Sequence, residues 1–201
     1  KADDLIDRLE ANALKEVEAR HADLSEAEKR QTAHEIAVGA LRYFLLKFTR
    51  TTVIVFDFAE ALSFEGETGP YCQYAVVRAN SIFRKLESNE LENSIQTISS
   101  SQNEVSEIFE TGEGSEIWSL LILAARLEEI VANAASNIEP AILAKYTFNL
   151  AKAFNLFYAR HKIIAEENLA KRAVLITVAE ITRKQLKAAL ETLGISVPER
   201  M

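Results

Sequence analysis

Apolar residues recur at helical spacing through most of the 201-residue chain. Between residues 3 and 20 they fall three or four positions apart, which is typical of a helix with one buried face. The same spacing predicts further helices over 25–47, from Pro70 onwards, and over 116–135, 141–162 and 166–193. Ser25 and Glu28 form a capping-box pattern at the second helix, and Gly194 is typical of the position after a helix end. The pattern predicts a mainly α fold whose second half is an antiparallel helical bundle.

Two segments depart from this pattern. Residues 52–58 (TVIVFDF) are β-branched and aromatic, which predicts one short strand, and a short helix is expected over 59–64. Residues 88–115 are rich in Ser, Asn, Gln and Glu, so we expect helix ends around a mobile connection there. Between the two, the turn GETGP at 66–70 interrupts the chain, and its proline suits the first turn of the next helix.

Composition restricts the class of protein. The longest apolar run, 120–125, is only six residues, which is too short to cross a membrane. The charged first residues lead us to expect no signal peptide. The single cysteine, Cys72, cannot form an internal disulfide, which fits a reducing cytosol. We therefore expect a cytoplasmic protein with no membrane partner.

Charge is unevenly distributed along the chain. The net charge of −7 argues against a nucleic-acid partner. Yet residues 71–86 carry three basic and no acidic side chains, and residues 140–201 carry ten basic and five acidic ones. Residues 87–139 carry one basic and eleven acidic side chains. Two basic blocks that meet in space would attract a polyanion, whereas blocks that stay apart would form an ordinary mixed surface.

Catalytic and cofactor-binding motifs are absent from the sequence. The GETG turn lacks the Lys-Ser/Thr pair of a phosphate-binding loop. The histidines His21, His34 and His161 have no cysteine or carboxylate at metal-ligand spacing. We therefore assign no catalytic residue, metal or cofactor to this chain, and expect the histidines to be surface or partly buried residues.

The helix after Pro70 has two different faces. At 100° per residue, its predicted core face consists of Cys72, Ala75, Val76, Ala79, Phe83 and Leu86. Another edge carries Tyr71, Tyr74, Arg78, Ser81 and Lys85. Such an edge suits unstacked RNA bases, because the rings stack on bases and the cations hold phosphates or base edges. Alternatively, the tyrosines pack against a neighbouring helix while the cations stay solvated.

An aromatic helix in the second half raises the same question. Its predicted core residues are Tyr146, Leu150, Phe154 and Phe157. The candidates for an outward-facing edge are Tyr158, Arg160, His161 and Lys162. The next helix adds positive charge through Lys171, Arg172, Arg183, Lys184 and Lys187, a pattern that is also typical of a solvated face.

Three separated motifs resemble arginyl-tRNA synthetases. Residues 39–85 resemble the junction segment of that family, with a GA-hydrophobic-K/R-Y helix, an FD strand and a G-x-TGPY-x-QYAxxRxxSIxRK turn. Residues 139–158 (EPAILAKYTFNLAKAFNLFY) resemble the EP…LA…FNxFY pattern of its helical anticodon-binding domain. Residues 193–201 (LGISVPERM) resemble its LGI-x-x-PxRM terminus. The motifs occur in the family's order, and the similarity covers essentially the whole chain.

The resemblance implies a C-terminal part of a class I synthetase. The HIGH-like and KMSKS-like ATP-binding motifs of the family are missing from this chain, which alone should therefore be inactive. Residues 1–65 would form a stem-contact region and residues 66–201 a DALR-type anticodon-binding domain. The implied partners are an arginine tRNA and the upstream catalytic domain, and DNA is not expected. The intact enzyme would use ATP with Mg²⁺ to join arginine to its tRNA.

The resemblance also suggests the binding residues. All arginine codons have G in second position, so the tRNA presents C in the middle of its anticodon. The expected anticodon-binding residues are Tyr71, Tyr74, Arg78 and Lys85, with Tyr158 and Met201 on the opposite wall. The candidate phosphate contacts are Arg160, Lys162 and Lys171. Two alternatives stay open: a related domain of another tRNA synthetase, and a helical protein-interaction domain without an RNA role.

Overall fold

The computed structural model describes residues 2–201, and every regular element within that range is an α-helix. The helices are α1 (Ala2–Arg20), α2 (Glu26–Leu46), α3 (Phe58–Ala61), α4 (Gly69–Phe83), α5 (Glu90–Ser100), α6 (Gln102–Phe109), α7 (Gly112–Ala125), α8 (Leu127–Asn137), α9 (Pro140–Arg160) and α10 (Leu169–Thr192). The predicted mainly α fold is confirmed. Over the same range, no helix is long and apolar enough to cross a membrane.

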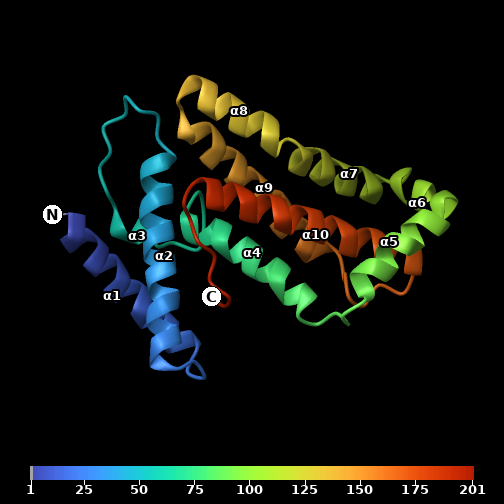
Figure 1. Cartoon of the computed structure of the whole chain (residues 1–201), viewed down its shortest axis with the longest axis horizontal. Helices are drawn as coiled ribbons and strands as arrows, with labels where there is room; N and C mark the ends of the chain where they lie inside the picture. Colours follow the sequence, from blue (N-terminus) through green and yellow to red (C-terminus); the bar gives the residue numbers. More distant parts are fainter. Residues whose placement is uncertain (1) are drawn as a thin grey trace.

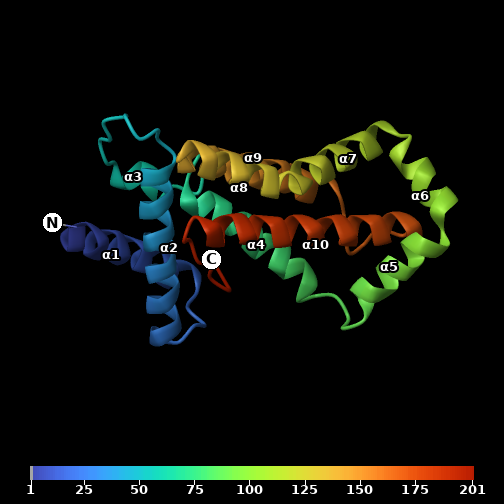
Figure 2. The same cartoon turned by 45° about the horizontal axis from the view of Figure 1, so that its top comes forward.

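The helices form a pair and a bundle that meet at α2. Figures 1 and 2 show α1 packed against α2 at one end of the molecule, with α4, α9 and α10 side by side in the bundle. α8 and α9 form an antiparallel hairpin, and α5 and α6 close the far end of the bundle beside α10 (Figures 1 and 2). α4, which carries the predicted binding edge, therefore lies between the α1–α2 pair and the rest of the bundle.

The bundle core contains the face of α4 that periodicity predicts. Cys72, Ala75, Val76 and Ala79 are completely buried in it, together with side chains of α7, α9 and α10. α2 contributes Tyr43, whose hydroxyl donates a hydrogen bond of 2.9 Å to the carbonyl oxygen of residue 144 in α9. A smaller cluster holds α1 against α2. α2 thus belongs to both clusters and connects the N-terminal pair to the bundle.

The start of α2 and the end of α10 follow the sequence signals. The Ser25 hydroxyl accepts a hydrogen bond from the backbone N–H of Glu28, and the Glu28 carboxylate accepts one from the N–H of Ser25. This is the predicted capping box. Gly194 has a φ of +71°, a left-handed conformation that glycine adopts easily after a helix.

The strand predicted over 52–58 does not form in the described part of the chain. Residues 52–57 have no regular secondary structure and pair with no strand. Ile54 and Phe56 turn inwards, while Val53 and Val55 are 89% and 83% exposed. Local β propensity is therefore present without a neighbouring strand to use it, and β structure requires such a partner. The Asp57 side chain instead caps α3 by accepting from the N–H of Glu60 at 2.9 Å.

The polar segment 88–115 is more regular than expected. Instead of a mobile connection it forms α5, α6 and the first turn of α7. Leu91, Ile98 and Val105 recur every seven residues and pack against the bundle core. Burial of this apolar stripe against α10 explains how a segment rich in Ser and Asn becomes helical, since tertiary contacts override weak propensity.

The single helix predicted over 116–135 is divided at Arg126 into α7 and α8. The Tyr146 hydroxyl lies at the break, 3.0 Å from the carbonyl oxygen of Leu123 and 3.1 Å from that of Ala124. The Leu123 carbonyl oxygen also accepts a hydrogen bond from the backbone N–H of Arg126, so the hydroxyl adds a second partner there and one at Ala124. Burial of this hydroxyl raises the pKa of Tyr146 to about 12.

Candidate RNA-binding surface

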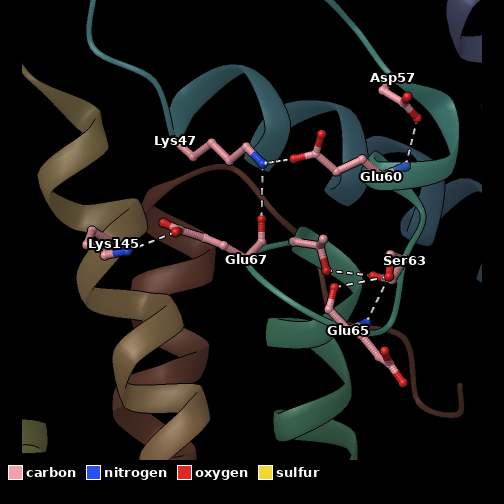
Figure 3. A network of polar contacts seen from close by, with 8 residues as sticks. Lys47, Asp57, Glu60, Ser63, Glu65, Glu67 and Lys145 are labelled. Carbon is pink, nitrogen blue, oxygen red and sulfur yellow. Dashed lines mark hydrogen bonds and ion pairs between the residues drawn. The ribbon is translucent and has the colours of Figure 1, made fainter.

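The turn before α4 is held by both neighbouring parts of the structure. In Figure 3, Lys47, the residue directly after α2, is bound to the Glu60 carboxylate and to the carbonyl oxygen of Glu67; the two contacts measure 2.6 and 3.4 Å. The Glu67 carboxylate pairs with Lys145 of α9 at 2.9 Å. The Thr68 hydroxyl caps α4 by accepting from the N–H of Tyr71. The orientation of α4 is thus fixed relative to α2 and α9.

Arg78 lies between two tyrosines at the junction of α4 and α9. Its guanidinium carbon is 4.5 Å from the ring centre of Tyr74 and 5.5 Å from that of Tyr158. One of its terminal nitrogens, Nη1, donates a 3.1 Å hydrogen bond to Oδ1 of Asn155. All four side chains are half-buried. This group, named the Arg78 cluster below, presents aromatic rings and a cation at a partly exposed edge, as a single-stranded RNA site requires.

The other tyrosine of the predicted edge has a different environment. Tyr71 packs against Phe148 of α9, with ring centres 5.4 Å apart. Tyr74 contacts Phe64 edge-on at 6.1 Å, and the Arg20 guanidinium of α1 lies 4.8 Å from the Phe64 ring. Packing against a neighbouring helix therefore describes Tyr71, while Tyr74 joins the Arg78 cluster to the N-terminal pair of helices.

Hydrogen bonds to α4 place the C-terminal tail beside the same edge. The Gln73 side-chain amide donates to the carbonyl oxygen of Ser196 at 2.7 Å, and Arg84 donates to that of Glu199 at 3.1 Å. Met201 then lines a small apolar pocket with Phe64, the residue that contacts Tyr74. Met201 therefore packs against the α1–α2 cluster, connected to Tyr74 through the Phe64 ring, and within the described residues it does not share a pocket with Tyr158.

The two basic blocks of the sequence meet in one groove. Its lining includes Ser81 and Lys85 from the first block and Tyr158 and Lys162 from the second. Lys85 and Lys162 are exposed and form no ion pair in the described range of residues. Because Tyr158 belongs to both the groove and the Arg78 cluster, the two sites are continuous.

The remaining phosphate candidates are paired with carboxylates. Arg160 forms an ion pair with Glu116, and the hydrogen bond between them lowers the pKa of Glu116. Lys171 contacts Glu113 at 2.9 Å and Glu166 at 3.3 Å. The hydrogen bond to Glu113 raises the pKa of Lys171. Both cations are thus neutralised by partners, unlike Lys85 and Lys162.

His161 faces inwards and is not part of an outward edge. Its side chain is 3% exposed, and its Nδ1 lies 3.0 Å from the Glu113 carboxylate. Burial lowers the pKa of this imidazole despite the nearby carboxylate. Neither here nor anywhere else in residues 2–201 is a group of three His, Cys, Asp or Glu side chains placed to hold a metal ion.

Sequence analysis does not identify two contributors to the Arg78 cluster and its surroundings. Asn155 precedes Tyr158 by three residues, so helical spacing places both on one face and could have indicated it. Phe64 carries no such signal, because its contact with Tyr74 depends on the path of the turn between α3 and α4.

Comparisons with known proteins identify the family of this chain. Residues 72–201 match the model of the DALR anticodon binding domain family. The chain is 36% identical over 200 residues to an arginine–tRNA ligase of Lactococcus lactis subsp. cremoris, covering 99% of this chain and 32% of the relative. It is also 36% identical over 201 residues to that of Pyrococcus furiosus, covering 98% of this chain and 31% of the relative. The chain therefore spans about a third of the length of these curated relatives.

Solved structures show the same similarity. Thermus thermophilus arginyl-tRNA synthetase has a TM-score of 0.81 at 28% identity, covering 100% of this chain and 32% of that one. The Plasmodium falciparum enzyme has a TM-score of 0.72 at 24% identity, with 99% and 32% coverage, and supports the fold alone. Because the family model matches well over half of the chain, this chain belongs to the DALR anticodon-binding domain family.

Proposed function

We propose that this chain recognises the anticodon of an arginine tRNA as the C-terminal part of an arginine–tRNA ligase. The family and the ligase relatives support the proposal, and the observation that carries it is the Arg78 cluster. Tyr74 and Tyr158 offer rings on which unstacked bases can stack, and Arg78 offers several N–H donors for a base edge. Tyr71 and Met201 flank this cluster in the proposed pocket.

The groove next to the cluster is the proposed path of the RNA backbone. Lys85 and Lys162 line it and carry no competing carboxylate, so their charges are available to phosphates. The positive charge of the two basic blocks therefore attracts RNA at this groove, although the protein as a whole is acidic. This explains how a chain with net charge −7 attracts RNA.

Titration with two tRNA transcripts tests the proposal. One is an arginine tRNA, and the other differs only in the middle anticodon base. At low ionic strength we expect the cognate transcript to bind about tenfold or more tightly, because one specifically bonded and stacked base contributes about 1–3 kcal/mol. Equal affinities for the two transcripts would contradict anticodon recognition. A preference for a tRNA of another amino acid would favour a different synthetase, and absence of RNA binding a protein-interaction role.

The lysines should differ in their contribution to RNA affinity. Substituting Lys85 or Lys162 by alanine should lower affinity equally for both transcripts. Each should reduce the slope of log affinity against log salt by about one. Lys171→Ala should have a smaller effect, because its ammonium group already pairs with Glu113 and Glu166. The measurement is a salt series of binding constants, and an equal loss for Lys171→Ala would contradict this ranking.

The function of the intact protein follows from the same proposal. Its catalytic part would lie outside this chain, bind ATP with Mg²⁺ and join arginine to the bound tRNA in the cytoplasm. Residues 1–65 would connect that part to the anticodon-binding domain at 66–201. This chain by itself would bind tRNA without charging it.

A further inference from the structure

Asn155 is the side chain that holds Arg78 in place. It lies on α9, and its Oδ1 accepts the 3.1 Å hydrogen bond from Nη1 of Arg78. Within residues 2–201, no other side chain forms a hydrogen bond or ion pair with Arg78. Asn155 is half-buried, so this bond is partly protected from water.

Arg78 has an amide as its only side-chain hydrogen-bond partner among the described residues, whereas Arg183, which also donates to an amide (Asn80), pairs with Glu180 as well. Seven other arginines of the described residues form ion pairs with carboxylates: Arg20, Arg50, Arg126, Arg160, Arg172, Arg183 and Arg200. A carboxylate would fix the guanidinium of Arg78 but would also cancel its charge. The neutral amide accepts one hydrogen bond and leaves the positive charge uncompensated.

The bond also determines how the guanidinium lies between its two aromatic neighbours. Arg78 projects from α4, with Tyr74 one turn before it on the same helix. Asn155 and Tyr158 both come from α9, one turn apart. Anchoring Nη1 on α9 therefore holds the side chain across the gap between the helices. Without that bond, an arginine side chain has many rotamers to choose from, and ordering it on RNA binding would cost affinity.

We propose that Asn155 is a positioning residue for anticodon discrimination: it orients the Arg78 guanidinium towards the anticodon base without neutralising it. This inference rests on the proposed function and adds a residue on which its specificity depends. Asn155 acts through Arg78 and needs no contact with the RNA itself.

The experiment uses the 201-residue chain and the same two arginine tRNA transcripts. In Asn155→Ala, affinity for the cognate transcript should fall about tenfold, with little change for the transcript altered in its middle anticodon base, because a hydrogen bond to a charged group is lost. Asn155→Asp keeps the shape but adds a carboxylate. It should also weaken cognate binding and lower the salt slope by about one, because Arg78 is then neutralised.

Two controls separate positioning from a structural role. Asn149 is an exposed asparagine on the same helix, and Asn149→Ala and Asn149→Asp should bind both transcripts like the wild type. In an Arg78→Ala background, adding Asn155→Ala should change cognate affinity less than twofold, because a residue that acts through Arg78 is not additive with it. Thermal unfolding of each variant reports whether the fold is retained.

The outcomes distinguish this inference from the proposed function. A wild type that binds both transcripts equally contradicts the proposed function. A wild type that discriminates, with Asn155→Ala and Asn155→Asp behaving like the Asn149 variants, overturns the role of Asn155. Additive losses in the Arg78→Ala background overturn it as well, since they would show an effect that does not pass through Arg78.

Discussion

Replacing Arg78 by alanine should lower affinity for the cognate arginine tRNA by about 10- to 100-fold. This range corresponds to the loss of charged hydrogen bonds and of a cation held against stacked rings. The same change should remove most of the preference for the cognate anticodon, because Arg78 is the only cation placed between Tyr74 and Tyr158 among the described residues. Binding titrations with the cognate and anticodon-altered transcripts measure both effects.

A lysine at position 78 separates charge from geometry. Arg78→Lys should keep the salt dependence of binding but lose most of the discrimination, because an ammonium group lacks the planar, multi-donor shape of guanidinium. Arg126→Ala provides the matched control. Arg126 is an exposed arginine at the junction of α7 and α8, paired with Glu129 at 2.8 Å, and its removal should leave tRNA binding unchanged. If Arg78→Ala retained wild-type discrimination, the site would have to be placed elsewhere.

Replacing Gly69 by alanine should destabilise the protein by about 2–4 kcal/mol, a typical cost of an unavoidable clash at a buried contact. A Cβ atom at Gly69 would lie 2.3 Å from the carbonyl oxygen of Gly39 in α2, and backbone atoms cannot rotate out of the way. α2 and α4 would have to separate. The Gln73 side-chain amide, which donates to the carbonyl oxygen of Glu35 in α2, would then lose its geometry.

Gly112 gives a matched control for this substitution. Like Gly69, it is the first residue of a helix, but a Cβ there would meet nothing within 4 Å. Gly112→Ala should therefore be neutral or slightly stabilising. Urea unfolding of both variants measures the difference. If Gly69→Ala changed the free energy of unfolding by less than about 0.5 kcal/mol, the close contact of α2 and α4 would not limit stability.

Short-range sequence patterns were sufficient to predict most helices. They were insufficient where the local structure depends on a contact from a distant part of the chain. The capping box at Ser25 and the core face of α4 are encoded within a few residues, and the structure confirms both. Residues 52–58 show the opposite case, because β propensity has no effect without a partner strand in the described chain. The break between α7 and α8 lies where the Tyr146 hydroxyl, from a helix more than twenty residues away, bonds to carbonyl groups of α7.

The sequence by itself determined most of the long helices, the buried face of α4 and the line of tyrosines and cations along its edge. Periodicity suffices for these, because each helical residue's direction follows from its neighbours. Only the tertiary structure decided which of these residues come together. It brings Arg78 of α4 between Tyr74 and Tyr158, supplies Asn155 as its anchor, and neutralises Lys171 but not Lys85. The reason is that charge pairing and stacking depend on distances between separate helices, which spacing along one helix does not contain.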